Sequence, residues 1–127
     1  MIVLDASAAL PALLGTGPAR SALASEQVHA PHLIDAEVAS ALRRLVSGGR
    51  IGPEAGWRAL STWQHLGTIR YPLVGLLERV WDLRNTLSPY DASYVALAEA
   101  LECPLLTGDR RLARAAGLRC PVTVVPS

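Results

Sequence analysis

Residues 1–10, MIVLDASAAL, contain the transition from which the expected fold follows. Three apolar residues, 2–4, run directly into Asp5, and Ser7 then precedes a second apolar run. The first run predicts a short buried strand, and the second predicts a helix close behind it. A strand that passes at once into a helix is typical of α/β proteins, in which helices cover both faces of a parallel sheet.

Asp5 stands at the boundary between these two elements and has two possible roles. Its side chain could cap the helix, because an aspartate oxygen accepts hydrogen bonds from free N–H groups of the first helical turn. It could instead line an acidic pocket, because open α/β sheets bind ligands at the carboxyl ends of their strands. If Asp5 faces a pocket, Ser7 or a nearby backbone group would satisfy the helix start in its place.

The composition predicts one globular domain over residues 1–127. Half of the residues are apolar, and a chain of this length buries enough surface to fold without a disulfide or a zinc ion. No apolar segment reaches the roughly 18 residues of a membrane span, and no signal peptide is recognisable, so we expect a cytoplasmic protein with no membrane attachment. All 12 basic residues are arginine, which excludes any mechanism that requires lysine.

Cysteine and histidine give weak signals. Cys103 and Cys120 form no CxxC motif and are expected to be small buried side chains with free thiols. His29 and His32 have HxxH spacing but lie across a proline, without further ligands to complete a tetrahedral zinc site. The net charge of +1 does not indicate a generally basic nucleic-acid-binding surface.

Helices and strands alternate along the rest of the chain. Apolar spacing and terminal glycines predict helices over residues 7–14, 18–26, 33–47, 53–66, 73–87, 88–102 and 110–117. Short β-forming runs predict strands over residues 1–4, 28–31, 68–72, 103–109 and 121–125. This alternation predicts a three-layer α/β/α sandwich with a mostly parallel sheet.

Three aspartates fall at the boundaries of these elements. Asp5 follows the first strand, Asp91 lies in the first turn of the helix that Ser88 opens, and Asp109 follows the strand around PLLT. Each could simply offset the dipole at a helix N-terminus. Each could equally face a pocket at the carboxyl edge of the sheet.

Glu37 lacks the capping explanation because it lies a turn inside its helix. On a helical wheel it falls roughly 80 degrees from the centre of the apolar stripe, at the edge of the buried face. Asp35 lies at a similar distance off the opposite edge, so the wheel alone does not show which acid points inward. Asp35 is closer to the helix start and therefore has the better dipole explanation.

Four segments, in order, resemble the PIN-domain nucleases and, within them, the VapC toxins of toxin–antitoxin modules: IVLDASAAL, HLIDAEVASALRR, LSPYDASYVALAEAL and LLTGDRRLARAAG. They span residues 2–117, which is nearly the whole chain. One departure is Leu112, where many relatives have an aromatic residue, and this change affects packing rather than an acid.

The resemblance implies a PIN-like α/β/α fold, Mg²⁺ or Mn²⁺ as cofactor, and cleavage of RNA that leaves 5′-phosphate and 3′-hydroxyl ends. It also implies a homodimer and a cognate VapB-like antitoxin that covers the site. The residues that match the family motif are the catalytic, metal-binding acids and two hydroxyl residues that orient them: Asp5, Glu37, Asp91 and Asp109, with Ser7 and Thr107.

Substrate and antitoxin contacts follow less directly. Arg110 and Arg111 begin the last helix beside the expected pocket and could bind substrate phosphates, or could form an ordinary exposed basic face. Trp57 and Trp63 could stack on bases, but tryptophans at helical spacing more often fill a core or a partner's groove. In this family the middle helices meet the antitoxin, so we favour that role. Single-stranded loops of tRNA or rRNA are the default substrate.

The chemistry also follows from the residue types. Four carboxylates in one pocket repel one another, so such a cluster requires a cation. Oxygen ligands without histidine or cysteine favour Mg²⁺ or Mn²⁺ over zinc, and such an ion promotes in-line hydrolysis of a phosphodiester. Receiver domains and haloacid-dehalogenase-type phosphatases have a similar layout but need a lysine. A PIN-type nuclease of housekeeping RNA processing and a non-catalytic α/β binding module, with the acids as caps, are the alternatives.

Overall fold

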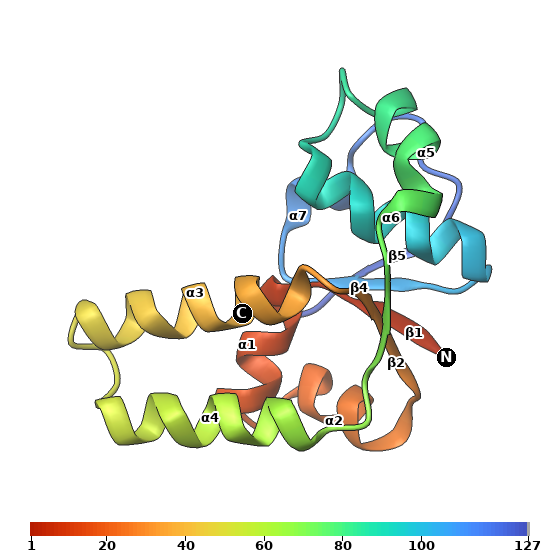
Figure 1. Ribbon diagram of the computed structural model, residues 1–127. Helices are drawn as coiled ribbons and strands as arrows, with labels where there is room; N and C mark the ends of the chain where they lie inside the picture. Colours follow the sequence, from red (N-terminus) through yellow and green to blue (C-terminus); the bar gives the residue numbers. More distant parts are fainter. Residues whose placement is uncertain (127) are drawn as a thin grey trace.

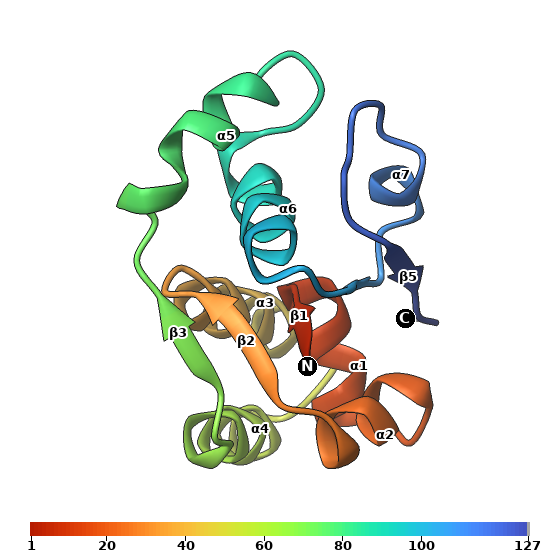
Figure 2. The same cartoon turned by 90° about the vertical axis from the view of Figure 1, so that its right-hand side faces the viewer.

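A five-stranded parallel sheet forms the centre of the computed structural model, which describes residues 1–126. The strands are β1 (Ile2–Leu4), β2 (Val28–Pro31), β3 (Ile69–Tyr71), β4 (Leu105–Thr107) and β5 (Val122–Val124). They lie in the order β3-β2-β1-β4-β5, and each neighbouring pair is parallel. Figure 2 shows β3, β2, β1 and β5 in this order from one side of the sheet to the other. β1 is therefore the central strand, with β2 and β4 on its two sides.

Helices cover both faces of this sheet. They are α1 (Ala6–Leu14), α2 (Pro18–Ser25), α3 (Ile34–Ser47), α4 (Pro53–His65), α5 (Leu77–Asp82), α6 (Pro89–Leu101) and α7 (Arg110–Ala113), with a short 3-10 helix, η1 (Val74–Leu76), before α5. Helices α5, α6 and α7 lie on one face, and α1, α2, α3 and α4 lie on the other (Figure 1). The predicted α/β/α sandwich with a parallel sheet is confirmed.

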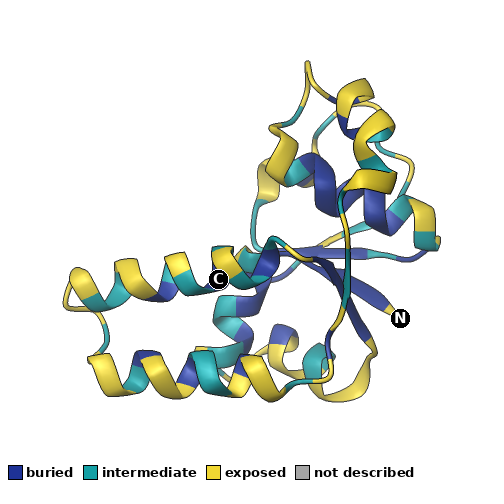
Figure 3. Cartoon of the chain, viewed as in Figure 1, coloured by how far each residue is buried: buried dark blue, intermediate teal, exposed yellow. Residues whose placement is uncertain are grey.

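The core lies where β1 meets α6. Val3 and Leu4 of β1 are fully buried, and seven consecutive residues of α6, 92–98, are buried as well (Figure 3). Alanines at three of these positions allow α6 to lie close to the sheet, where it contacts β1, β2 and β4. None of the helices in residues 1–126 has both the length and the apolarity that crossing a membrane requires.

The cysteines and His29 have structural surroundings. Cys103 is buried and Cys120 half-buried, both as free thiols, and burial raises the pKa of Cys120 to about 11. His29 Nδ1 lies 2.6 Å from the Tyr71 hydroxyl, so this ring joins β2 to β3. Among the described residues, no histidine or cysteine belongs to a group of three metal-ligating side chains.

The helix expected over residues 73–87 is shorter than the sequence predicted. Only Val74–Leu76 and Leu77–Asp82 are helical, as η1 and α5, and residues after Leu83 form turns. Pro89 accounts only for the extended backbone of the residue before it, because α5 already ends at Asp82. Ser88 has φ −63 and ψ 158, and it serves as the N-cap of α6.

Helices α3 and α4 pack against each other and project from the body of the molecule (Figure 1). Asp35 ties this pair to the sheet. Its carboxylate accepts two bonds from the Arg70 guanidinium of β3, at 2.7 and 2.9 Å, and one from the Trp63 indole N–H of α4, at 2.8 Å. Asp35 is therefore a structural acid, and Trp63, at 1% exposure, is a core residue rather than a base-stacking one.

We expect Asp35→Ala to lower the free energy of unfolding by about 1–2 kcal/mol, because it removes the acceptor of Trp63 and Arg70. The Arg70 bonds hold the pKa of Asp35 below its ordinary value of 3.8. The ionised carboxylate therefore stabilises the fold above that pH, and its contribution is lost as the pH falls through the lowered pKa. Urea unfolding of wild type and variant at neutral and acidic pH measures both effects.

Asp82→Ala, which removes an exposed acid on α5, is the matched control. A loss of stability no larger than that of the control, or a difference from wild type that does not shrink in acid, would contradict this role of Asp35.

Candidate active site

The candidate acids lie around the carboxyl ends of β1 and β4. The chain adds β2 and β3 on one side of β1, and β4 and β5 on the other. Such a reversal leaves a crevice at the carboxyl ends of the two strands, which is where α/β sheets bind their ligands. Asp5 directly follows β1, and Thr107 is the last residue of β4.

Asp5 is buried in this crevice, with 6% of its surface exposed. Ser7 Oγ donates to Oδ1 at 2.6 Å, Thr107 Oγ1 donates to Oδ2 at 2.5 Å, and the Ala8 N–H donates to Oδ1 at 3.1 Å. Burial raises the pKa of Asp5, although these three donors act in the opposite direction. The surroundings of Asp5 therefore favour a neighbouring cation that would neutralise its charge.

Asp5 caps the helix that follows it, as its position suggested. It is the N-cap residue of α1 through its bond from Ala8, and its other oxygen is held by Thr107 of β4. The expectation that Ser7 or a backbone group would satisfy the helix start in place of Asp5 is wrong. Ser7 instead donates to the capping oxygen itself.

Gly108 allows the loop after β4 to lie against Ser7. Its N–H donates to Ser7 Oγ at 2.7 Å, and Thr107 Oγ1 lies 3.1 Å from the same oxygen. A Cβ at Gly108 would lie 2.8 Å from the Ser7 carbonyl oxygen, a distance too short for any side chain. Sequence reasoning did not single out Gly108, and its place between Thr107 and Asp109 was the available signal.

Asp91 faces the crevice from the first turn of α6. Ser88 caps this helix by accepting the Asp91 N–H at 3.2 Å, so the Asp91 carboxylate is not needed as a cap. Burial, and then the negative charge of Asp109, raise the pKa of Asp91, and Asp91 in turn adds to the raised pKa of Asp5. Asp91 therefore lies within electrostatic reach of Asp5 and of Asp109.

Asp109 is bound to a residue that was predicted to hold substrate. Its carboxylate accepts bonds from Arg111 Nε at 3.2 Å and Nη2 at 3.0 Å, and these bonds lower its pKa. A hollow of about 360 Å³ opens beside the pair and beside Asp91. Arg110 is exposed and lines a different hollow next to β5. Of the two arginines, only Arg111 touches a candidate acid through a hydrogen bond.

Glu37 approaches the crevice from α3 and is half-buried. Its Oε1 accepts a bond from the hydroxyl of Tyr94, on α6, at 2.5 Å. The helical wheel left Asp35 and Glu37 as alternatives. The structure places Glu37 beside a residue whose pKa also responds to Asp5 and Asp91, while Asp35 binds Arg70. Tyr94 was missed from the sequence, although it is three residues beyond Asp91 and so on the same helix face.

The chemistry of these groups fits a hard divalent cation. They offer carboxylate and hydroxyl oxygens, without imidazole or thiolate, which suits Mg²⁺ or Mn²⁺ rather than zinc. As the side chains lie, no three acidic, histidine or cysteine residues within 1–126 converge closely enough to hold one ion. Both carboxylate oxygens of Asp109 are bound to Arg111, so an ion shared with Asp109 requires this side chain to rotate.

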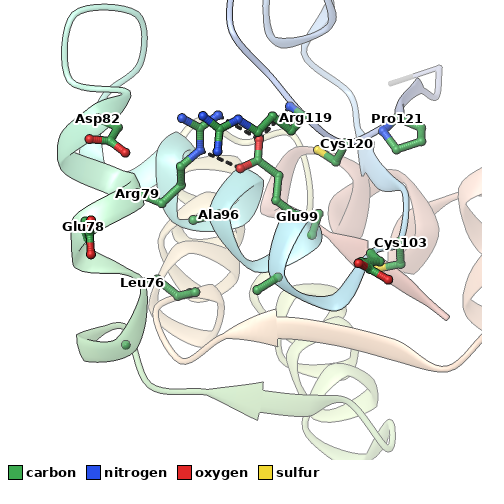
Figure 4. Close-up of a pocket in the computed structure, with 14 residues that line it drawn as sticks. Leu76, Glu78, Arg79, Asp82, Ala96, Glu99, Cys103, Arg119, Cys120 and Pro121 are labelled. Atoms are coloured by element: carbon green, nitrogen blue, oxygen red, sulfur yellow. Dashed lines mark hydrogen bonds and ion pairs between the residues drawn. The ribbon is translucent and has the colours of Figure 1, made fainter.

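Another hollow, of about 700 Å³, lies away from these acids, beside α5, α6 and the segment before β5 (Figure 4). Arg79 Nε binds Glu99 Oε1 there at 2.6 Å, and Arg79 Nη2 donates to the Gly117 carbonyl at 2.7 Å. The Arg119 N–H donates to Glu99 Oε2 at 2.7 Å. These bonds fasten α5 and the last loop to α6, which is a structural role.

Comparison with known proteins identifies the family. The PIN-domain family model matches residues 2–118. Ribonuclease VapC9 of Mycobacterium tuberculosis is 59% identical to this chain over 126 residues, which cover 99% of each. This chain belongs to the VapC family of PIN-domain proteins.

Solved structures of other proteins are similar in fold to this chain. The crystal structure of PAE2754 from Pyrobaculum aerophilum has a TM-score of 0.72 to this chain, with 26% sequence identity over 95% of this chain and 81% of that one. A toxin–antitoxin complex from Klebsiella pneumoniae has a TM-score of 0.69, with 21% identity and complete coverage of both chains. The second likeness shows the shared fold.

We expect Gly108→Ala to lower the free energy of unfolding by about 1–3 kcal/mol, because the added methyl group displaces Ser7 from the loop after β4. Gly67→Ala is the matched control, since a Cβ there meets no atom within 4 Å. Denaturant unfolding of both variants measures the difference. Equal stability of the two variants would show that the Ser7 contact tolerates a side chain.

Proposed function

We propose that this VapC-family chain is the toxin of a toxin–antitoxin module, acting as a divalent-metal-dependent endoribonuclease that hydrolyses RNA phosphodiester bonds. The observation that carries the proposal is the buried carboxylate of Asp5, held by Ser7 and Thr107, in a chain 59% identical to Ribonuclease VapC9. A phosphodiester would add negative charge to this crevice. A bound cation would offset the negative charge of both the acids and the substrate.

The four acids would hold this cation, Mg²⁺ or Mn²⁺, through their carboxylate oxygens: Asp5, Glu37, Asp91 and Asp109. When bound, such an ion supplies charge stabilisation at phosphorus and an acidified water for in-line attack. The oxygen-only donor set supports this choice of metal.

The chain's own residues orient the site and the substrate. Ser7 and Thr107 each donate a short bond to Asp5 and so hold its carboxylate in one orientation. Arg111 has an 88% exposed side chain, so it can turn from Asp109 to a substrate phosphate while Asp109 turns to the cation. Arg110 would bind a neighbouring phosphate through its paired donors. The products would carry 5′-phosphate and 3′-hydroxyl ends.

Substrate and partners follow from the family. We infer a tRNA or rRNA loop as substrate, because unpaired bases are the ones that proteins read in RNA. We also infer a homodimer in the cytoplasm and a cognate VapB-like antitoxin. The exposed Trp57 on α4, with 61% of its surface accessible, supports an antitoxin contact on the α3–α4 pair.

Wild-type protein is expected to cleave RNA with Mn²⁺ or Mg²⁺ and to lose this activity in chelator. Asp5→Asn should reduce cleavage by about 100-fold or more, because the site loses the negative charge of its most buried proposed metal ligand. Asp82→Asn, which changes an exposed acid on α5, should leave cleavage unchanged. Equal activity of wild type and Asp5→Asn would exclude Asp5 from the site.

Expression of the wild type should also arrest growth, and Asp5→Asn should relieve the arrest. Cleavage without growth arrest would favour housekeeping RNA processing over a toxin.

Manganese alone should raise the melting temperature by several degrees in the absence of RNA. A ligand that binds only the folded protein at a hundredfold excess over its Kd stabilises it by about 2.7 kcal/mol. Asp5→Asn should reduce this shift and Asp82→Asn should retain it. An unchanged melting temperature of the wild type in millimolar Mn²⁺ would favour the alternative of a non-catalytic module with capping acids.

A further inference from the structure

Tyr94 joins the two helical layers at the acidic crevice. It is 2% exposed, and its hydroxyl donates to Glu37 Oε1 at 2.5 Å across 57 positions of sequence. The bond runs from α6, on one face of the sheet, to α3, on the other (Figure 1). It is therefore a contact between layers, made at the edge of the sheet where Asp5 lies.

The Tyr94 hydroxyl acts as a hydrogen-bond donor to Glu37. An ionised carboxylate has no hydrogen to donate, so the phenolic O–H supplies the proton of this bond. Because Tyr94 is almost fully buried, water has little access to the bond. The hydroxyl therefore restrains the carboxylate that approaches from α3.

Glu37 depends on this bond more than Asp5 or Asp109 depends on any one of theirs. Asp5 accepts bonds from two side chains and a backbone N–H, and Asp109 accepts several from Arg111. For the Glu37 carboxylate, Tyr94 is the one hydrogen-bond donor found in residues 1–126. A glutamate also has one more rotatable bond than an aspartate, so an untethered Glu37 would lose more conformational entropy on binding an ion.

Helix α6 couples this tether to a second acid. Asp91 and Tyr94 are three residues apart and so lie on neighbouring parts of one helix face. Asp91 reaches the crevice directly, while Tyr94 holds the acid that comes from α3. A single rigid helix thus sets the separation of Asp91 and Glu37.

We propose that Tyr94 is a positioning residue of the metal site, whose hydroxyl holds Glu37 through Oε1 and leaves Oε2 for the cation that Asp5 and Asp91 also bind. The inference rests on the proposed metal-dependent function. It assigns to Tyr94 the role toward Glu37 that Ser7 and Thr107 have toward Asp5.

Tyr94→Phe tests this role, because it removes the hydroxyl and keeps the ring. Loss of a group that orients a metal ligand typically weakens metal binding by 10- to 100-fold. We expect the Kd for Mn²⁺, measured by thermal shift without RNA, to rise about tenfold, and the Mn²⁺ concentration for half-maximal cleavage to rise in parallel. Excess Mn²⁺ should restore most of kcat.

Tyr71→Phe is the matched control, since it removes a hydroxyl that bonds to His29, away from the acids. It should leave the Mn²⁺ affinity unchanged. In a Glu37→Gln background, Tyr94→Phe should weaken Mn²⁺ binding no further, because the hydroxyl acts through the Glu37 carboxylate. A folded Tyr94→Phe with wild-type Mn²⁺ affinity would overturn the inference, as would a full additional loss in the Glu37→Gln background.

A measurement on the wild type covers the case in which Tyr94→Phe does not fold. The chain has 3 tyrosines, so ring-labelled protein gives a spectrum that Tyr71→Phe and Tyr90→Phe assign by elimination. Titration with Mg²⁺ should move the Tyr94 signal, with the same midpoint concentration as the thermal shift measured in Mg²⁺. A Tyr94 signal that does not move would overturn the inference. If wild type binds neither ion, the proposed function fails; if it binds them independently of Tyr94, only the positioning role fails.

Discussion

The burial of Asp5 at the end of the central strand is the constraint on which the rest of the site depends. A carboxylate at 6% exposure is costly in a folded protein unless donors or a cation compensate for the lost water. The chain supplies donors from two distant segments, Ser7 after β1 and Thr107 at the end of β4. Because Ser7 must also accept the N–H of Gly108, the loop after β4 passes close to α1 and leaves no space for a side chain.

The negative charge near Asp5 is spread over several acidic side chains. Asp91 and Asp109 raise the pKa of their neighbours in turn, while Arg111 lies on Asp109 and Tyr94 lies on Glu37. Glu37 and Asp109 therefore each have a hydrogen-bond donor on the carboxylate. These donors help a metal-free chain to fold with four acids around one sheet edge, of which Asp5 is the most buried.

The fold and the candidate acids could be predicted from the sequence, but the hydrogen-bond partners of these acids could not. Alternating strands and helices predicted the α/β/α sandwich, because apolar periodicity reports directly on which side of an element is buried. Periodicity does not report the order of the strands, so the meeting of β1 with β4 could not be derived from it. Helical spacing also left Asp35 and Glu37 equivalent, because their difference lies in partners from other elements, Arg70 and Tyr94.

Two further features could not be predicted from the sequence, for related reasons. Tyr94 reads as an ordinary apolar position on a buried helix, and only its hydroxyl contact reveals its place among the acids. The helix predicted over residues 73–87 was too long because apolar spacing continues beyond Asp82, where the backbone instead forms turns. Apolar spacing indicates which positions are buried, but it does not show which groups a buried side chain contacts or where the helix ends.

The pairing of Asp5 with Thr107 also has a consequence for synthesis. The two residues are 102 positions apart, and β4 must enter the sheet between β1 and β5. Asp5 thus leaves the ribosome well before Thr107, and its oriented form must wait for β4, because contacts between distant segments form only when both have emerged. A nascent chain therefore carries an incomplete site until β4 has been made and has entered the sheet beside β1.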